Sequence, residues 1–218
     1  DVECSVEGYY KEMDGLLSYR EGGGFLADLD GNWESQVTQG IGNSYGMEVL
    51  FQKKRGSTAG WIGYTLSWSN RQFDDLNSGE WFPFTYDRRH DVSVVLTQDI
   101  NEMWSASAAW VYGTGRAVTL TESIYNGVEF GSLGAPSYEV PSERNAYRMS
   151  PYHRLDVSMT RVKPDTDGNR ALIFSLYNAY NNLNPFFALA EEEPDGSRVI
   201  REYGLFPVIP SIAWRFHF

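Results

Sequence analysis

The most informative segment of the chain reads Trp104-Ser105-Ala106-Ser107-Ala108-Ala109-Trp110-Val111-Tyr112. Its aromatic residues, Trp104, Trp110 and Tyr112, all stand at even positions, while the odd positions carry serine, alanine and valine. Alternate side chains of a β-strand point to opposite faces, so this spacing predicts a strand. One face of that strand is large and aromatic, and the other face is small.

The same alternation recurs along the chain, and helical spacing is nearly absent. Four further segments alternate clearly, at residues 62–69, 91–100, 155–160 and 208–218. Three more fit less cleanly, at residues 2–19, 45–54 and 170–180. We therefore predict an all-β chain with eight strands.

The small, polar face of these strands distinguishes two classes of β protein. A soluble sandwich usually carries Lys and Glu on its wet face, whereas here that face is mostly Ser, Thr, Gly, Ala and Asp. A transmembrane barrel has an apolar band outside, a polar lumen inside and aromatic residues at both interfaces. From Trp104 to Tyr112 a strand spans roughly 26 Å. Tilted by about 40°, it covers a height of about 20 Å, close to the ~25 Å apolar band of such barrels.

Short and long connections alternate between the expected strands. Tight turns are expected at residues 55–58, 101–103 and 164–169, and long connections at 20–44, 73–88, 119–152 and 181–206. Outer-membrane barrels have short periplasmic turns and long extracellular loops. We therefore predict antiparallel transmembrane β-barrel strands in the outer membrane of a Gram-negative cell, in contact with membrane lipid and lipopolysaccharide. The alternative is a soluble lectin-like sandwich with accidental loop asymmetry.

Composition excludes several other classes. The chain has 218 residues, with 18 Lys and Arg against 29 Asp and Glu, and this net charge of −11 argues against a nucleic-acid partner. A hydrophobic content of 42% argues against disorder, and no apolar run is long enough for a helical span. Cys4 is the single cysteine, so no internal disulfide forms. Residues 1–7 do not read as a signal peptide, so we expect a removed leader or a longer parent polypeptide.

A series of short motifs carries a family resemblance. They lie at residues 61–69 (WIGYTLSWS), 84–91 (FTYDRRHD), 110–115 (WVYGTG), 147–149 (YRM), 152–156 (YHRLD), 177–181 (YNAYN), 184–186 (NPF) and 205–212 (LFPVIPSI). In this order and spacing the chain resembles TonB-dependent outer-membrane receptors of the Bacteroidetes type, from about residue 44 to residue 218.

The resemblance implies a 22-stranded barrel closed by an N-terminal plug. Such a receptor imports a scarce nutrient, such as a metal chelate, cofactor or oligomer, with energy from a TonB-type complex of the inner membrane. This chain contains neither the plug nor the motif that contacts that complex, so residues 1–218 are expected to be the C-terminal part of the barrel. The expected partners are then the plug and upstream strands. The alternative is a small, self-closed eight-stranded barrel with a structural or adhesive role.

The last strand ends in Trp214-Arg215-Phe216-His217-Phe218. Trp214, Phe216 and Phe218 are in phase, and a terminal aromatic residue after such alternation looks like the outer-membrane assembly signal. We therefore predict that the barrel-assembly machinery recognises this strand by strand pairing. The alternative is a closing strand without a recognition role.

Aromatic residues are frequent in the expected extracellular loops. Trp33, Trp81, Phe82, Tyr86 and Tyr125 are the candidates for substrate binding, because aromatic faces stack on sugars and chelates. The alternative is packing between loops at the rim of the barrel.

No catalytic motif is present, so neither an enzyme nor a cofactor is expected. His90, His153 and His217 lack a nucleophile placed by a third group, and we interpret them as structural. Asp28, Asp30 and Asn32 form the pattern D-x-D-G-N, which recurs at residues 165–169 and places carboxylates as some calcium loops do. Neither copy has the bidentate Glu of an EF-hand, and the same residues simply make turns.

Overall fold

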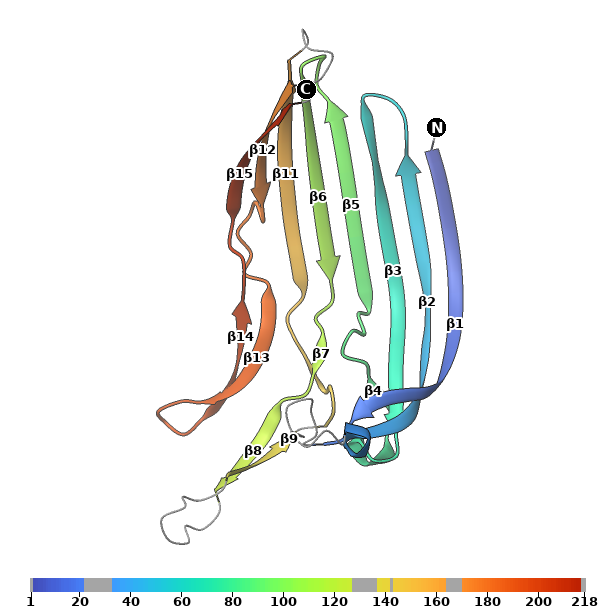
Figure 1. Cartoon of the computed structure of the whole chain (residues 1–218), viewed down its shortest axis with the longest axis vertical. Helices are drawn as coiled ribbons and strands as arrows, with labels where there is room; N and C mark the ends of the chain where they lie inside the picture. Colours follow the sequence, from blue (N-terminus) through green and yellow to red (C-terminus); the bar gives the residue numbers. More distant parts are fainter. Residues whose placement is uncertain (1, 22–32, 127–136, 142, 164–169, 217–218) are drawn as a thin grey trace.

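The computed structural model describes residues 2–21, 33–126, 137–141, 143–163 and 170–216. The main sheet is antiparallel, with eight strands in the order β1-β2-β3-β5-β6-β11-β12-β15 (Figure 1). These strands are β1 (Val2–Tyr19), β2 (Val37–Lys53), β3 (Thr58–Phe73), β5 (His90–Asp99), β6 (Trp104–Gly113), β11 (Tyr152–Val162), β12 (Arg170–Tyr177) and β15 (Ile209–Phe216). Each of the eight expected segments overlaps one of them, so the prediction of an all-β, antiparallel chain is confirmed.

The predicted number of strands was wrong, because the described residues alone form fifteen. The short strand β4 (Phe82–Pro83) pairs with β3 and makes the main sheet nine-stranded. Six more strands form three separate pairs: β7 (Ala117–Val118) with β10 (Tyr147–Arg148), β8 (Thr121–Asn126) with β9 (Ser137–Pro141), and β13 (Pro185–Glu192) with β14 (Arg198–Gly204). Six of these seven lie within the expected long connections, and β7 lies just before the connection expected at residues 119–152. Polar residues and turn residues obscure the alternation there.

Strand β2 also begins earlier than predicted, because glycines interrupt its pattern. A Cβ atom on Gly40 would lie 2.4 Å from a ring atom of Phe73, and one on Gly42 would lie 2.8 Å from a methyl carbon of Leu16 and 3.0 Å from the carbonyl oxygen of Asn70. Only glycine fits such close approaches, so residues 37–44 carry no alternation of side chains and read as a loop in the sequence.

The strand register confirms the predicted faces. Directly opposite residues share a face, and one polar row crosses five strands through Thr97, Ser107, Ser158, Ser175 and Ser211. The neighbouring rows carry large apolar side chains on the other face of the sheet. We call this the apolar face, and its members include Val6, Tyr10, Tyr45, Met47, Phe51, Ile62, Val94, Leu96, Trp110, Leu155, Val157, Met159, Phe174, Ile212 and Trp214.

The apolar face is largely uncovered. Ile62 on β3 is 47% exposed and Ile212 on β15 is 72% exposed, and many of the other large side chains on this face are exposed as well. A small hydrophobic core lies elsewhere, at one end of the sheet, where Phe73, Leu76 and Phe82 are buried together. The eight-stranded face is therefore a surface rather than a core.

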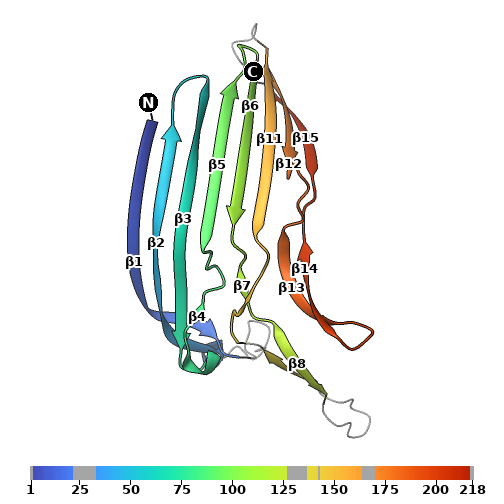
Figure 2. The ribbon, with the colours of Figure 1, turned by 180° about the vertical axis from the view of Figure 1, so that it is seen from behind.

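The two ends of the sheet differ, as predicted. The turns after β2 and β5, at residues 54–57 and 100–103, are short and lie at one end, which we call the turn end. The connections after β1, β3, β6 and β12 are long and lie at the opposite end, which we call the loop end (Figure 2). The short strand pairs extend from the loop end.

The sheet is open. Strands β1 and β15 stand at the two ends of the strand order, and they do not pair with each other among the described residues. Both present an exposed edge. Helical structure in the described residues is limited to two short 3₁₀ turns, η1 (Trp33–Gln36) and η2 (Asn77–Gly79), neither of which approaches the length and apolarity needed to traverse a bilayer.

Candidate functional site

Long connections converge at the loop end of the main sheet (Figures 1 and 2). The β3–β5 loop covers residues 74–89, the β6–β11 connection covers residues 114–151, and the β12–β15 connection covers residues 178–208. Polar side chains tie these segments to one another and to the strands. The resulting geometry defines the candidate site.

A buried carboxylate, Asp87, fixes the β3–β5 loop. Its side chain accepts hydrogen bonds from Arg148 Nη2 at 2.6 Å and from the backbone N–H of Ser69 at 2.8 Å. Arg89 Nη2 lies 3.5 Å from the same carboxylate. Asp87 is only 2% exposed, so this charge is compensated by its arginine partners rather than by water.

Arginines also pack on aromatic rings in the same region. The guanidinium carbon of Arg71 lies 3.5 Å from the ring centroid of Phe84, and that of Arg89 lies 4.3 Å from a ring centroid of Trp68. Both distances allow cation–π attraction. Some loop aromatics are thus engaged in packing at the rim.

The β13–β14 hairpin is attached to the other connections through Glu202. This carboxylate accepts hydrogen bonds from the Tyr147 hydroxyl at 3.0 Å and from the Ser150 N–H at 2.8 Å. Burial raises the pKa of the Tyr147 phenol, and its hydrogen bond to Glu202 raises that pKa further. Arg116 donates a hydrogen bond to the carbonyl of Phe186 at the base of the hairpin.

Asn178 fixes the start of the β12–β15 connection. It is fully buried with φ of 54°, a conformation that asparagine tolerates better than most residues. Its side chain donates to the carbonyls of Asn182 at 2.9 Å and Phe206 at 3.0 Å, and its N–H donates to Asp156 Oδ1 at 2.9 Å. The Asn178 side chain therefore joins the two ends of the β12–β15 connection.

A pocket of about 240 Å³ lies between these anchored segments. Arg88 and Arg116 supply cationic groups, Tyr86 and Tyr152 supply hydroxyl groups, and Phe186 supplies an aromatic ring. Such a lining suits a small ligand with an anionic group and a flat apolar part. We call it the rim pocket.

A hydrogen-bonded arginine continues the rim pocket down the polar face. Arg154 Nη1 donates to the hydroxyls of Tyr152 and Tyr177, each at 2.9 Å, and its Nε donates to Asp156 Oδ2 at 3.0 Å. The wall below the pocket therefore presents ordered polar groups.

The predicted aromatic residues fall into different environments. Tyr86 is 67% exposed, packs edge-on against Phe84 at 5.3 Å between ring centroids, and lines the rim pocket. Trp81 is 44% exposed but does not line that pocket. Phe82 is 4% exposed and stacks on Phe73 in the small core, so its ring supports the loop and leaves no surface for a ligand.

Other predicted positions have less structural description. Trp33 begins η1 and Tyr125 lies in β8, but their side chains are outside the described part of the structure. The calcium candidates Asp28, Asp30 and Asn32, and their second copy at residues 165–169, also lie outside the described residues. Within the described ranges, no three His, Cys, Asp or Glu side chains are grouped to hold a metal ion.

The C-terminal strand presents its aromatic residues on the apolar face. Trp214 and Phe216 are exposed, and their ring centroids are 5.5 Å apart. Phe218 lies outside the described residues, as does His217. The other two histidines are hydrogen-bonded to tyrosines: His90 Nδ1 lies 2.9 Å from the Tyr64 hydroxyl, and His153 Nδ1 lies 3.0 Å from the Tyr180 hydroxyl.

Sequence reasoning missed the charged part of the site. Asp87 and Arg88 belong to one of the motifs that carry the family resemblance, but no binding or anchoring role was assigned to them. Arg116 stands alone in a long connection, and Arg148 belongs to the YRM motif at residues 147–149, but nothing in their spacing signals a pocket. The run Asp87-Arg88-Arg89 was the one feature of the sequence that could have indicated a charged site, because three adjacent charges beside a strand need partners.

No protein-family model, no curated protein and no solved structure matches this chain.

Proposed function

We propose that the chain forms part of the wall of a transmembrane β-barrel in a Gram-negative outer membrane, in an importer of the TonB-dependent kind. The observation that carries the proposal is the apolar face, which continues without interruption across eight strands and is largely exposed. Soluble monomers rarely expose so large an apolar patch. Lipid acyl chains are the cover that its extent and period-2 pattern suit best.

Aromatic residues stand near both ends of the apolar face. Towards the loop end, Tyr45 stacks between Tyr10 at 6.3 Å and Trp68 at 5.2 Å, measured between ring centroids. At the turn end, Trp104 and Trp214 share one row, and Phe216 stands one row further out. Aromatic side chains gather at the two interfaces of a membrane, so this distribution supports a spanning orientation.

The open edges favour a wide barrel over a small one. An eight-stranded barrel closes only if its first and last strands pair, and β1 and β15 do not pair in the described structure. In a wide barrel further strands cover both edges, which removes the aggregation hazard of an unpaired strand. This is the reason to prefer a receptor-sized barrel, with a plug in its lumen, over a small structural or adhesive barrel.

Import is proposed from the sequence resemblance together with the rim pocket. In the proposed orientation the loop end is extracellular, so the rim pocket meets ligands before the lumen does. Its arginines, tyrosines and phenylalanine suit a scarce nutrient that carries both charge and a flat apolar group. A plug and an energising inner-membrane complex are the further parts that this function needs.

Cysteine labelling tests the proposed orientation. In a Cys4→Ser background, Ser197→Cys places a thiol at the tip of the β13–β14 hairpin, and Ser57→Cys places one in the β2–β3 turn. Both serines are exposed, and both substitutions are nearly isosteric. We expect a membrane-impermeant maleimide to label the Ser197→Cys protein in intact cells and the Ser57→Cys protein only after the outer membrane is permeabilised. Equal labelling of both in intact cells would contradict a spanning sheet.

Tyr86→Ala and Trp81→Ala test the role of the rim pocket in uptake. Both side chains are exposed, so each substitution should change stability by no more than about 0.5 kcal/mol. We expect Tyr86→Ala to weaken binding of the native nutrient several-fold, because stacked aromatic pairs contribute about 0.5–1.5 kcal/mol. Trp81→Ala should leave binding unchanged, because Trp81 lies outside the pocket. Uptake assays on cells with matched surface abundance measure the difference, and equal uptake by both variants would remove the pocket from the proposal.

A further inference from the structure

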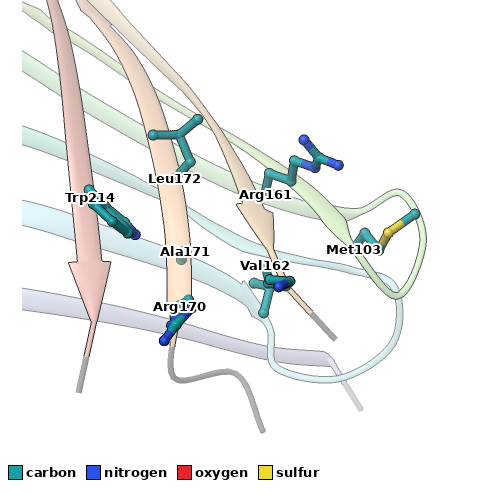
Figure 3. Close-up of a pocket in the computed structure, with 8 residues that line it drawn as sticks. Met103, Arg161, Val162, Arg170, Ala171, Leu172 and Trp214 are labelled. Atoms are coloured by element: carbon teal, nitrogen blue, oxygen red, sulfur yellow. The ribbon is translucent and has the colours of Figure 1, made fainter. Parts of the chain in front are cut away.

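A second pocket lies at the turn end of the sheet, far along the strands from the rim pocket. Its volume is about 370 Å³, and it is formed by the β5–β6 turn together with the ends of β11, β12 and β15. Figure 3 shows Leu172 and Arg170 on one strand, Trp214 on the strand beside it, and Arg161 and Met103 on the other side. We call it the turn-end pocket.

The backbone around the turn-end pocket is fixed by hydrogen bonds. The N–H of Val162 donates to the carbonyl of Met103 at 2.8 Å, which joins the end of β11 to the β5–β6 turn. The N–H of Lys163 donates to the carbonyl of Arg170 at 3.0 Å, which joins β11 to β12. The pocket is therefore framed by paired strands rather than by a free loop.

Among the described residues, the charged side chains that line the turn-end pocket are all cationic. Arg161, Lys163 and Arg170 are all present in its wall, although the chain as a whole carries a net charge of −11. Among the described residues neither Arg161 nor Arg170 forms an ion pair with a carboxylate. The guanidinium of Arg161 instead lies 5.7 Å from the ring centroid of Trp104. Positive charge is thus concentrated at one point of an acidic chain.

The same pocket opens onto the apolar face. Arg161 stands opposite Trp104 on β6 and Leu172 on β12, and Leu172 stands opposite Trp214 on β15. This row belongs to the apolar face, and Trp214 is 68% exposed. The next rows along the strands continue with apolar side chains such as Phe174 and Ile212. Basic groups therefore meet the end of a hydrophobic surface, with aromatic rings between them.

We propose that the turn-end pocket binds the phosphate of an anionic phospholipid in the periplasmic leaflet, an inference that rests on the proposed function. A guanidinium donates two parallel hydrogen bonds to phosphate oxygens, and Arg161 and Arg170 supply two such groups. The acyl chains of the same lipid lie along Phe174 and Ile212, while Trp104 and Trp214 sit at headgroup level. A diacyl lipid satisfies both halves of the site, whereas a free phosphate satisfies only the basic half.

The test uses the full-length native protein, purified in detergent and titrated with phosphatidylglycerol, phosphatidylcholine or inorganic phosphate. Native mass spectrometry reports the bound fraction. The wild-type protein should bind phosphatidylglycerol in preference to phosphatidylcholine. The double variant Arg161→Gln/Arg170→Gln should lose about 25-fold in apparent affinity, since each basic residue near a membrane surface contributes about fivefold. Inorganic phosphate should not displace the lipid, because it lacks the acyl chains.

A matched control removes two positive charges from another turn at the same end of the sheet. Lys53→Gln/Lys54→Gln lies in and beside the β2–β3 turn, outside the turn-end pocket, and should keep the wild-type lipid preference. The inference is overturned by equal binding of both lipids to the wild-type protein, by displacement with inorganic phosphate, or by equal losses in the pocket and control variants.

Heat-modifiable electrophoretic mobility separates failure of this inference from failure of the proposed function. A wild-type protein that shows no folded, heat-sensitive band in membranes would contradict the barrel itself. A folded wild-type protein without lipid preference would contradict only the turn-end pocket. If the double variant does not fold, Arg170→Gln alone replaces it, because Arg170 is the first residue of β12, and a loss of about fivefold is then expected.

Discussion

Asp87→Ala is expected to open the β3–β5 loop far more often than any surface substitution in the same loop. The carboxylate of Asp87 is buried and holds Arg148 at 2.6 Å, so its removal leaves a half-buried arginine without its carboxylate partner, with only the backbone carbonyls of Asp87 and Gly115 as acceptors. Breaking one side of a buried ion pair costs about 3–5 kcal/mol. Amide hydrogen exchange of residues 74–89 in the folded protein measures this local opening directly.

Asp75→Ala is the matched control for this prediction. Asp75 lies in the same loop and pairs with Arg20 at 2.8 Å, but about half of each side chain is exposed. An exposed pair contributes at most about 1 kcal/mol, so exchange in the loop should change little. Similar increases in exchange for both variants would show that Asp87 is not the anchor of the rim. If only Asp87→Ala lost the folded, heat-sensitive band in electrophoresis, Asp87 would be needed for folding of the whole sheet and not only for the loop.

The strands and their faces could be predicted because the pattern that determines them is local. In the segment from Trp104 to Tyr112, each side chain's face follows from its position in a period of two. The register between neighbouring strands is then restricted to those that place their apolar side chains on the same face of the sheet, since a slip of one residue moves every side chain of a strand to the other face. This is why Ser107 and Ser158, 51 positions apart, were assigned to the same kind of face and are hydrogen-bonded at 2.7 Å in the structure.

The rim pocket could not be predicted because its contacts join distant segments. Asp87 meets Arg148 across 61 positions, and Arg116 meets Phe186 across 70. Composition does not reveal which charge in a long connection finds which partner. For the same reason Phe82 read as a loop aromatic available to a ligand, whereas its contact with Phe73 places it in the core. Local alternation of side chains therefore predicts the strands and their faces, whereas contacts between distant segments determine the candidate site.

Val157→Arg and Ser158→Arg place the same charge at neighbouring positions of β11, on opposite faces of the sheet. Val157 lies midway along the strand, opposite Ala108 and Leu176 on the apolar face. An arginine facing lipid near the bilayer midplane costs about 2–4 kcal/mol. Ser158 lies in the polar row with Ser107 and Ser175, on the face that would line the lumen of the proposed barrel. We therefore expect Val157→Arg to lower the folded fraction strongly and Ser158→Arg to lower it only slightly.

The comparison is sharp because the two variants share strand, depth and charge, and differ only in the face. Urea titration of the native protein in lipid vesicles, followed by tryptophan fluorescence, gives the difference in unfolding free energy. A soluble sandwich buries one face of its sheet and exposes the other to water, so it also predicts different costs for the two variants. The dependence of the cost on depth in the membrane separates the two folds. In a barrel, an arginine should cost less at positions of the apolar face that lie nearer Trp104 than Val157 does, because charges near the interface cost only about 0–1 kcal/mol. A cost for Met159→Arg, two residues nearer the turn end, that equals or exceeds the cost at Val157 would argue that this face meets protein rather than lipid.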